Sequence, residues 1–291
     1  MERKIDGQPN PLAPFLDKIF VEDCLEGMKR IPSSSVDMVL CDLPYGTTQC
    51  KWDAIIPFAP LWAELSRIIK DHGAIVLTAS QPFTSALVMS NPDMFRYSWV
   101  WEKSKATGYL NAKKRPLVAH EDVLVFSKKT LIYRPQMWQG EPYNKGQALR
   151  PTDVYGSQKP VLVENKDGMR YPRSVQYFKT AESEGEVIHP TQKPLSLFEY
   201  LIRTYSVEGE TVLDCCMGSG TTAVAAAKNG RHFIGFEKDA DYARKSAKRI
   251  DEVCSSFELC LPEETQKPKR ASRSRKSNGE DCVVSEARSC L

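Results

Sequence analysis

The sequence TVLDCCMGSGTT at residues 211–222 decides the fold class. It begins with apolar, strand-forming residues, passes through Gly218 and Gly220, and leads into an alanine-rich segment with helical character. Glycine lets a backbone turn sharply and approach a ligand closely, and the start of a helix presents free N–H groups. A strand, a glycine turn and a helix in this order predict a nucleoside-binding loop in an α/β sheet.

The strand-like run after this loop ends at Glu237, whose carboxylate can accept hydrogen bonds from both hydroxyls of a ribose. Gly218, Gly220 and Ala223 also satisfy the dinucleotide fingerprint G-x-G-x-x-A, so an NAD-dependent oxidoreductase is an alternative. Two features count against it. Too little chain follows Glu237 for a second mononucleotide half, and Asp214 suits the positively charged S-adenosylmethionine (SAM) better than a pyrophosphate.

The rest of the chain alternates between helical and strand patterns. Apolar positions recur at helical spacing in residues 58–69, before a turn at Asp71, His72 and Gly73. Strands are expected at residues 36–41, 74–77, 97–101, 122–126, 211–213 and 232–236. This alternation predicts a doubly wound, Rossmann-like α/β sheet.

Two regions depart from the alternation. Residues 127–187 lack clear periodicity and are rich in Gly, Pro, Gln, Tyr and Lys, which indicates a functional insertion. Residues 262–291 are rich in Ser, Lys and Arg and poor in apolar residues, which predicts a basic disordered tail. We therefore expect one catalytic domain at residues 15–261 that contains the insertion.

Composition excludes several classes of protein. No apolar run approaches the roughly 18 residues of a membrane span, and the polar N-terminus lacks the apolar segment of a secretory signal, so we expect a cytoplasmic protein without a membrane partner. The nine cysteines include no C-x-x-C pair and no histidines are grouped beside them, so we expect reduced thiols and no metal. A net charge of +3 does not by itself indicate nucleic acid.

The tetrapeptide Asp42-Leu43-Pro44-Tyr45 follows an apolar strand, where open α/β sheets place their active sites. Methylation of an aromatic amine is difficult because the nitrogen lone pair is delocalised into the ring, so the amine hydrogens must be drawn towards acceptors. The Asp42 carboxylate supplies one acceptor, and the Leu43 carbonyl, restricted by Pro44, supplies a second. Tyr45 can stack on the base, with its hydroxyl peripheral, for about 1 to 3 kcal/mol. Taken alone, an ordinary turn explains the tetrapeptide equally well.

A third motif, His189-Pro190-Thr191-Gln192-Lys193-Pro194, precedes an amphipathic helix and by itself reads as a loop and helix start. In their order along the chain, the three motifs resemble those of the β group of DNA amino-methyltransferases. In that group the catalytic motif comes first, a target-recognition region follows, and the SAM-binding motif comes last. The resemblance covers residues 20–253 and implies a SAM-dependent methyltransferase sheet with an inserted target-recognition region at 127–187.

The resemblance also implies roles for individual residues. The target base would be held by Asp42, Leu43, Pro44 and Tyr45, and SAM by Asp23, Thr191, Lys193, Asp214, Gly218, Gly220, Thr221 and Glu237. An acidic surface residue explains Asp23 equally well. Family members usually have Asp-Pro-Pro-Tyr, so Leu43 is a departure that preserves the carbonyl. They usually have Pro-Phe in place of Cys215-Cys216, so the SAM pocket is expected to be less tightly packed here. For these two thiols we expect core packing rather than a nucleophilic role.

The implied function is site-specific transfer of a methyl group from SAM to adenine N6 of a flipped base in double-stranded DNA, as in restriction-modification. Asp rather than Ser at the start of the tetrapeptide favours adenine. A cytosine-N4 methyltransferase and a catalytically silent DNA-binding relative are the alternatives, and the sequence does not choose between a monomer and a homodimer.

A basic stretch in the middle of the chain is expected to contact DNA phosphates through Lys113, Lys114 and Arg115, although solvated surface residues are the simpler explanation for any one of them. The same stretch includes Lys103, Lys105, Lys128 and Lys129, interleaved with aromatic residues.

Overall fold

A computed structural model describes residues 4–5, 8–50, 53–148 and 161–262. Residues 1–261 form one compact unit, and residues 262–291 are assigned to a second. Apart from Pro262, the predicted basic tail lies outside the described residues. The boundaries predicted for the catalytic domain, residues 15 and 261, therefore stay a prediction.

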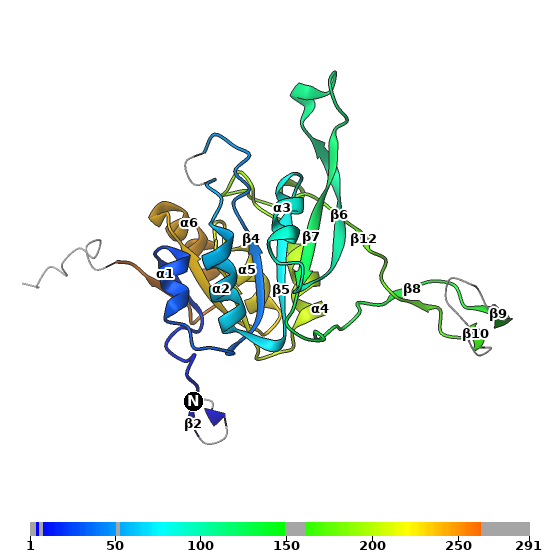
Figure 1. The fold of residues 1–291 in the computed structure, drawn as a ribbon, viewed down its shortest axis with the longest axis horizontal. Helices are drawn as coiled ribbons and strands as arrows, with labels where there is room; N and C mark the ends of the chain where they lie inside the picture. Colours follow the sequence, from blue (N-terminus) through cyan, green and yellow to red (C-terminus); the bar gives the residue numbers. More distant parts are fainter. Residues whose placement is uncertain (1–3, 6–7, 51–52, 149–160, 263–291) are drawn as a thin grey trace, which may run out of the picture. The chain divides into compact units, whose positions relative to one another are not determined.

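A nine-stranded sheet forms the centre of the first unit (Figure 1). In order across the sheet, its strands are β12 (Val175–Phe178), β6 (Phe95–Thr107), β7 (Val118–Phe126), β5 (Ile69–Ala79), β4 (Val36–Asp42), β13 (Thr211–Asp214), β14 (His232–Glu237), β3 (Lys18–Val21) and β15 (Glu258–Cys260). Among these strands only β7 runs antiparallel to its neighbours. The predicted α/β class is confirmed.

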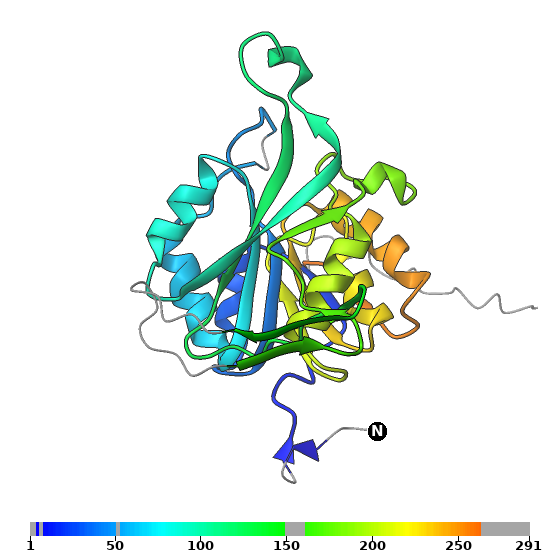
Figure 2. The ribbon, with the colours of Figure 1, turned by 90° about the vertical axis from the view of Figure 1, so that its right-hand side faces the viewer.

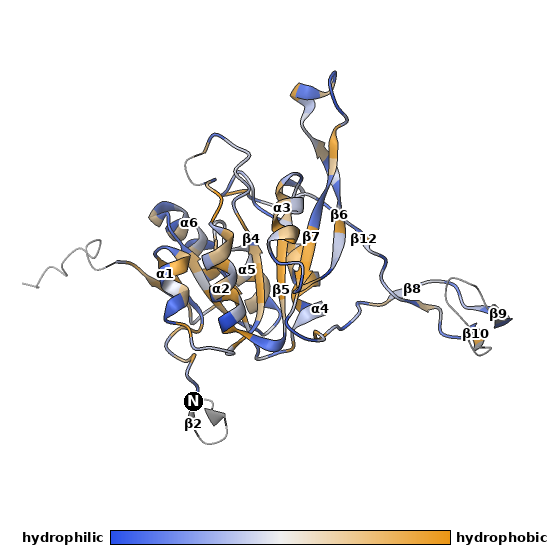
Figure 3. Cartoon of the chain, viewed as in Figure 1, coloured by the Kyte–Doolittle hydropathy of each residue, from blue (hydrophilic) through white to orange (hydrophobic). Residues whose placement is uncertain are grey.

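Helices cover both faces of this sheet (Figure 2). One layer contains α1 (Cys24–Lys29), α2 (Phe58–Ile68) and α3 (Phe83–Ser90), and the other contains α4 (Leu195–Tyr205), α5 (Thr221–Lys228) and α6 (Ala240–Asp251). Along β4, Val39 and Cys41 pack into the first layer, whereas Met38 and Leu40 pack into the second. Because both faces are buried, the middle of each central strand is mostly apolar, as its orange colour in Figure 3 shows.

The three helices predicted from the sequence are present as α2, α4 and α5, whereas α1 and α3 were not predicted. The apolar face predicted for α2 is buried, with Leu61, Leu65 and Ile68 fully inaccessible. Asp239 caps α6 by accepting hydrogen bonds from two backbone N–H groups of its first turn, an arrangement worth about 1 kcal/mol. None of the helices in the described part of the chain is long and apolar enough to cross a membrane.

Three strands extend beyond the residues predicted for them. β5 begins at Ile69, so Asp71, His72 and Gly73 belong to the strand rather than to the end of α2, and that prediction was wrong. β6 continues to Thr107, and β7 begins at Val118. Apart from the buried Ile69, Gly73 and Lys103, the added segments are exposed or half-buried and mostly polar, so the apolar periodicity that identifies buried strands is absent from them.

The predicted insertion at residues 127–187 contains short strand pairs. β8 (Trp138–Gln139) pairs with β11 (Met169–Arg170), and β9 (Tyr143–Ala148) pairs with β10 (Val161–Asn165). β12 lies in the same range, yet it joins the central sheet parallel to β6. Part of this range therefore extends the main sheet, and its role in target recognition stays a prediction. At the N-terminus, β1 (Lys4–Ile5) pairs with β2 (Gln8–Pro9).

Candidate active site

The three motifs meet at one edge of the sheet. β4, β13 and β14 are adjacent parallel strands, and they end at Asp42, Asp214 and Glu237 respectively. Carboxyl ends of neighbouring parallel strands form the usual binding crevice of an open α/β sheet. The structure thus brings the predicted catalytic residue close to the predicted nucleoside loop.

Three side chains donate hydrogen bonds to the Asp42 carboxylate. Tyr45 Oη lies 2.8 Å from Asp42 Oδ1, and the hydroxyl of Thr78, the residue paired with Asp42 on β5, bonds to the same oxygen. Lys193 Nζ lies 2.6 Å from Oδ2. Donors on three different segments therefore hold the carboxylate in one orientation.

Lys193 connects the third motif to the catalytic tetrapeptide. Its side chain is buried, and Nζ also lies 3.5 Å from Glu121 Oε2 and 5.5 Å from the centre of the Tyr45 ring. Burial lowers the pKa of Lys193, but the negative charges of Asp42 and Glu121 outweigh burial and raise the pKa above its ordinary value. The side chain is therefore a cation, and it contacts the catalytic carboxylate in addition to any role beside the cofactor.

The hydroxyl of Tyr45 is not peripheral, contrary to the sequence-based prediction. It donates to Asp42, while the ring stacks on Phe83 with the ring centres 5.1 Å apart. The side chain of Leu43 is 3% exposed and packs in the core, so a direct role of this residue at the site is restricted to its backbone. Pro44, which lies between Leu43 and Tyr45 in the chain, is half-buried.

We expect Tyr45→Phe to lower the rate of methylation about 10- to 100-fold. The variant loses one hydrogen bond to a charged acceptor, which is worth about 1.5 to 3 kcal/mol, but keeps the ring. Tyr45→Ala should be slower still because it also loses the stacking surface. Single-turnover methylation of a duplex at saturating SAM measures both effects, and wild-type activity in the Phe variant would show that the hydrogen bond to Asp42 is dispensable.

The loop after Tyr45 is shaped by Asp53. Its carboxylate accepts hydrogen bonds from the N–H groups of Gly46, Thr47 and Thr48 over 2.8, 2.9 and 2.6 Å. Burial raises the pKa of Asp53, but these donors outweigh burial and lower the pKa below its ordinary value. An ionised Asp53 therefore fixes the backbone next to the catalytic tetrapeptide.

Sequence reasoning did not single out Thr78, and the family resemblance marked Asp53 and Glu121 as family positions without giving either a role. Thr78 could have been found, because it directly follows the strand predicted at residues 74–77, and in the structure it pairs with Asp42. Glu121 reaches the site only because β7 lies beside β5, and strand order cannot be read from apolar periodicity.

Two carboxylates fold the glycine loop. Asp214 accepts from the N–H of Cys216 over 2.9 Å and from the hydroxyl of Thr222 over 2.6 Å. Glu237 accepts from the N–H of Gly218 over 2.7 Å. Gly218 and Glu237, two of the predicted cofactor residues, are thus in contact across the loop.

Gly218 and Gly220 have φ angles of +50° and +74°, where other residues are strained. A Cβ on Gly220 would lie 3.0 Å from the Cβ of Ser246, so the glycine also permits α6 to approach. Thr221 begins α5, and its hydroxyl lies 3.0 Å from Nη1 of Arg249. Both glycines are therefore required by the local backbone.

The loop carries buried negative charge. Burial and the charge of Cys215 raise the pKa of Asp214 to about 7, and burial raises the pKa of Glu237 above its ordinary value. A cationic ligand offsets part of the cost of burying an ionised carboxylate. These two carboxylates therefore suit a positively charged nucleoside such as SAM better than a pyrophosphate.

Asp23 and Thr191 make local contacts. Asp23 caps α1 by accepting from the N–H of Leu25 over 2.9 Å and lies 3.6 Å from Lys238 Nζ. The Thr191 hydroxyl lies 3.1 Å from His189 Nδ1. These contacts give both residues structural roles, and their contact with SAM stays a prediction.

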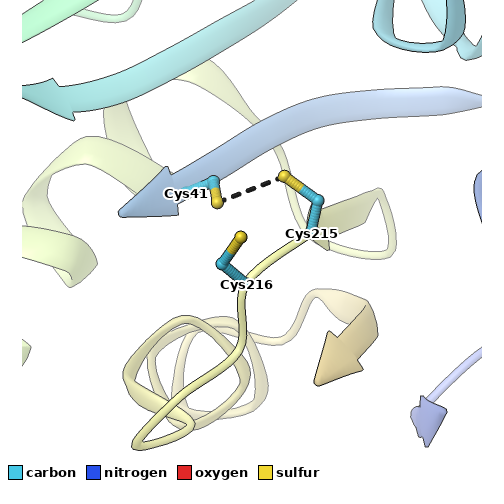
Figure 4. Close-up of side chains that lie close together, drawn as sticks. All are labelled: Cys41, Cys215 and Cys216. Carbon is cyan, nitrogen blue, oxygen red and sulfur yellow. Dashed lines mark hydrogen bonds between the residues drawn. The ribbon is translucent and has the colours of Figure 1, made fainter. Parts of the chain in front are cut away.

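Cys41, Cys215 and Cys216 lie together where β4 and β13 end (Figure 4). The Sγ atoms of Cys41 and Cys215 are 3.3 Å apart, and all three sulfurs lie within 4.8 Å of one another. Cys41 and Cys215 are buried in the first core layer, where thiols pack as small apolar groups. Sequence spacing could not indicate this cluster, because Cys41 and Cys215 are 174 residues apart in the chain.

The predicted DNA-contacting residues lie at the tip of the hairpin that joins β6 and β7. Lys113, Lys114 and Arg115 are all exposed, and none forms an ion pair with a described residue. Their charges are thus available to a polyanion, although this availability does not by itself identify one.

Known proteins share both sequence and fold with this chain. Type II methyltransferase M1.MboII of Moraxella bovis is 28% identical over 258 residues, covering 79% of this chain and 95% of that protein. Type II methyltransferase M.HpaI of Haemophilus parainfluenzae is 25% identical over 256 residues, covering 83% and 76%. The cytosine-N4-specific PvuII DNA methyltransferase has a TM-score of 0.57 at 17% identity, covering 84% of this chain and 95% of that one, and shows a shared fold.

The crystal structure of the M1.HpyAVI–SAM complex likewise shares the fold, with a TM-score of 0.55 at 24% identity over 80% of this chain and 98% of that one. The DNA methylase family (N6_N4_Mtase) matches residues 36–249, which is most of the chain and includes the ends of β4, β13 and β14. This protein therefore belongs to the DNA methylase family.

Proposed function

We propose that this protein transfers a methyl group from SAM to N6 of an adenine that has been flipped out of double-stranded DNA. The observation that carries the proposal is the Asp42 carboxylate, which Tyr45, Thr78 and Lys193 hold beside the glycine loop. M1.MboII and M.HpaI are both type II methyltransferases, which supports action at a specific sequence as part of restriction-modification.

The cofactor would be held by the residues of the glycine loop and by Glu237. When bound, SAM supplies the methyl group. Glu237 would accept hydrogen bonds from the ribose, and the buried charge of Asp214 would favour the cation. Thr191, Lys193 and Thr221 would line the other side of this ligand.

The target amine would bind at Asp42 Oδ2. A carboxylate oxygen accepts about two hydrogen bonds, and Oδ1 already accepts from Tyr45 and Thr78. Oδ2 accepts only from Lys193 among the described residues, so it has capacity for one amine hydrogen. The Leu43 carbonyl would accept the second hydrogen, which makes the nitrogen more tetrahedral and its lone pair available.

A second candidate is cytosine-N4 methylation, because a cytosine-N4-specific enzyme shares the fold. Long-read sequencing of DNA from cells that express the protein distinguishes the two, with cells expressing Asp42→Ala as the control. N6-methyladenine within a defined motif is the expected result. N4-methylcytosine in its place would overturn the assignment to adenine.

The charge of Asp214 leads to a pH dependence of cofactor binding. Its pKa of about 7 means that the group is mostly neutral at lower pH and ionised at higher pH. We expect the Kd for SAM to fall as the pH rises from about 6 to about 8, by at most tenfold per unit below the pKa. Calorimetric titrations across this range measure the effect, and Asp214→Asn should flatten it. A Kd that is constant or rises with pH in the wild type would contradict the role of this charge.

A further inference from the structure

Glu121 is a carboxylate on β7 that lies between two lysines of the active site. Its Oε1 is 3.3 Å from Lys103 Nζ, and its Oε2 is 3.5 Å from Lys193 Nζ. The Glu121 side chain is 17% exposed, and those of Lys103 and Lys193 are 4% and 8% exposed. Two ammonium groups therefore flank one carboxylate where little water reaches.

The Oε2 atom of Glu121 has unused capacity to accept a hydrogen bond. This atom is buried and makes no hydrogen bond with a described residue. Lys193 Nζ, at 3.5 Å, lies beyond the usual range, because Lys193 donates instead to Asp42 Oδ2 over 2.6 Å. A buried polar atom without a partner is costly and uncommon. A movement of Nζ by about 1 Å or less would give Oε2 a hydrogen bond of ordinary length.

Lys193 occupies the oxygen that the target amine needs. Under the proposed function the amine donates to Asp42 Oδ2, which already accepts from the Lys193 ammonium. Methyl transfer moves positive charge from the sulfonium of SAM to the amine nitrogen. A carboxylate stabilises this developing charge best when no other cation neutralises the same oxygen. Catalysis therefore favours an arrangement in which Lys193 has a different acidic partner.

The charges of the cluster balance only if Glu121 is counted. The cluster consists of two carboxylates and two ammonium groups, those of Asp42, Glu121, Lys103 and Lys193. The negative charges of Asp42 and Glu121 raise the pKa of Lys193, so this side chain stays a cation. Without the charge of Glu121 the cluster would be positive, which opposes a second positive charge on the amine.

We propose that Glu121 is a positioning residue that takes over the ammonium group of Lys193 when the target amine binds. The hydrogen bond of Lys193 would move from Asp42 Oδ2 to Glu121 Oε2, and no proton would be transferred. The charge of Asp42 would then be left for the amine. The inference rests on the proposed function, since it requires an amine at Asp42, and it applies equally to adenine and to cytosine.

The test is a double-mutant cycle with Glu121→Gln and Lys193→Met, made singly and together. Glutamine keeps the shape of Glu121 and removes its charge. The matched control is Glu102→Gln, which changes the net charge equally, because Glu102 is exposed and pairs with His120 on β7. Single-turnover methylation of a duplex at saturating SAM gives the rates, and titrations give the Kd values for SAM and DNA.

Glu121→Gln should lower the single-turnover rate about tenfold or more, while both Kd values change less than about twofold. Glu102→Gln should match the wild type. Lys193→Met should also be slow, because it leaves two buried carboxylates poorly balanced. In the Lys193→Met background, Glu121→Gln should leave the rate unchanged or raise it, since the charges balance again. A purely structural Glu121 would instead make the substitution harmful in both backgrounds.

A wild-type rate in Glu121→Gln, or an equal loss with and without Lys193, would overturn the role of Glu121. The comparison of Lys193→Met with the double variant remains valid even if Glu121→Gln alone is unstable. A wild type that methylates no duplex would instead overturn the proposed function.

Discussion

Replacing Asp42 by alanine is expected to slow methylation about 10²- to 10³-fold while the Kd for SAM changes less than about twofold. Removal of one preorganised electrostatic group from an active site has effects of this size. Asp42 contacts the predicted base site, whereas the glycine loop is folded by Asp214 and Glu237. Transfer of labelled methyl groups measures the first effect, and calorimetric titration with SAM measures the second.

Among the described residues, the alanine variant also leaves Lys193 with only Glu121 as a close acidic partner. Asp42→Asn is therefore the matched variant, because it keeps the shape of the side chain and one oxygen acceptor. It should also be strongly impaired, since an amide is a weaker acceptor than a carboxylate. Parallel loss of SAM binding and methylation in both variants would show that Asp42 does not belong to the base site alone.

Neutralising Lys113, Lys114 and Arg115 together to glutamine should weaken DNA binding strongly at low salt and flatten its salt dependence. Each phosphate contact contributes about 0.9 to the slope of log K against log salt, so loss of all three lowers the slope by up to about 2.7. Fluorescence anisotropy of a labelled duplex over a series of salt concentrations gives both quantities. The methylated sequence should be unchanged, because phosphate contacts do not read bases.

A control triple variant carries glutamine at Lys70, Lys128 and Lys129. These lysines lie at the opposite edge of the sheet, where β5 begins and β7 ends, and they lie close to acidic side chains. The control should therefore leave the salt slope unchanged. An equal fall in slope for both triples would mean that the basic hairpin tip has no special place in the DNA interface.

The central strands and the three motifs could be predicted because the residues that define them are adjacent in sequence. Apolar runs such as β4 and β13 are buried on both faces, and the catalytic tetrapeptide and the glycine loop each lie at the end of such a run. The contacts among the motifs depend on the order of strands across the sheet. That order brings Thr78 and Glu121 to the active site.

The basic stretch shows the same limit of sequence-based prediction. Lys103 is buried beside Glu121, with 3.3 Å between the charged atoms, whereas Lys113 and Lys114 are exposed at the hairpin tip. Lys129 lies at the far edge of the sheet, 2.5 Å from Asp71. These lysines are close in sequence, but the length and direction of β6 and β7 place them in different surroundings. Composition alone could not distinguish them.

Lys193 contacts both the predicted base site and the predicted SAM loop. Its Nζ bonds to Asp42, and its backbone carbonyl lies 3.4 Å from the Thr221 hydroxyl at the start of α5. A displacement of this residue on occupation of the cofactor loop would change the charge distribution around the base acceptor. Thermodynamic linkage would then require SAM and DNA to alter each other's affinity by the same factor. The segment that carries Lys193 is therefore where we expect any coupling between the two ligands to be transmitted.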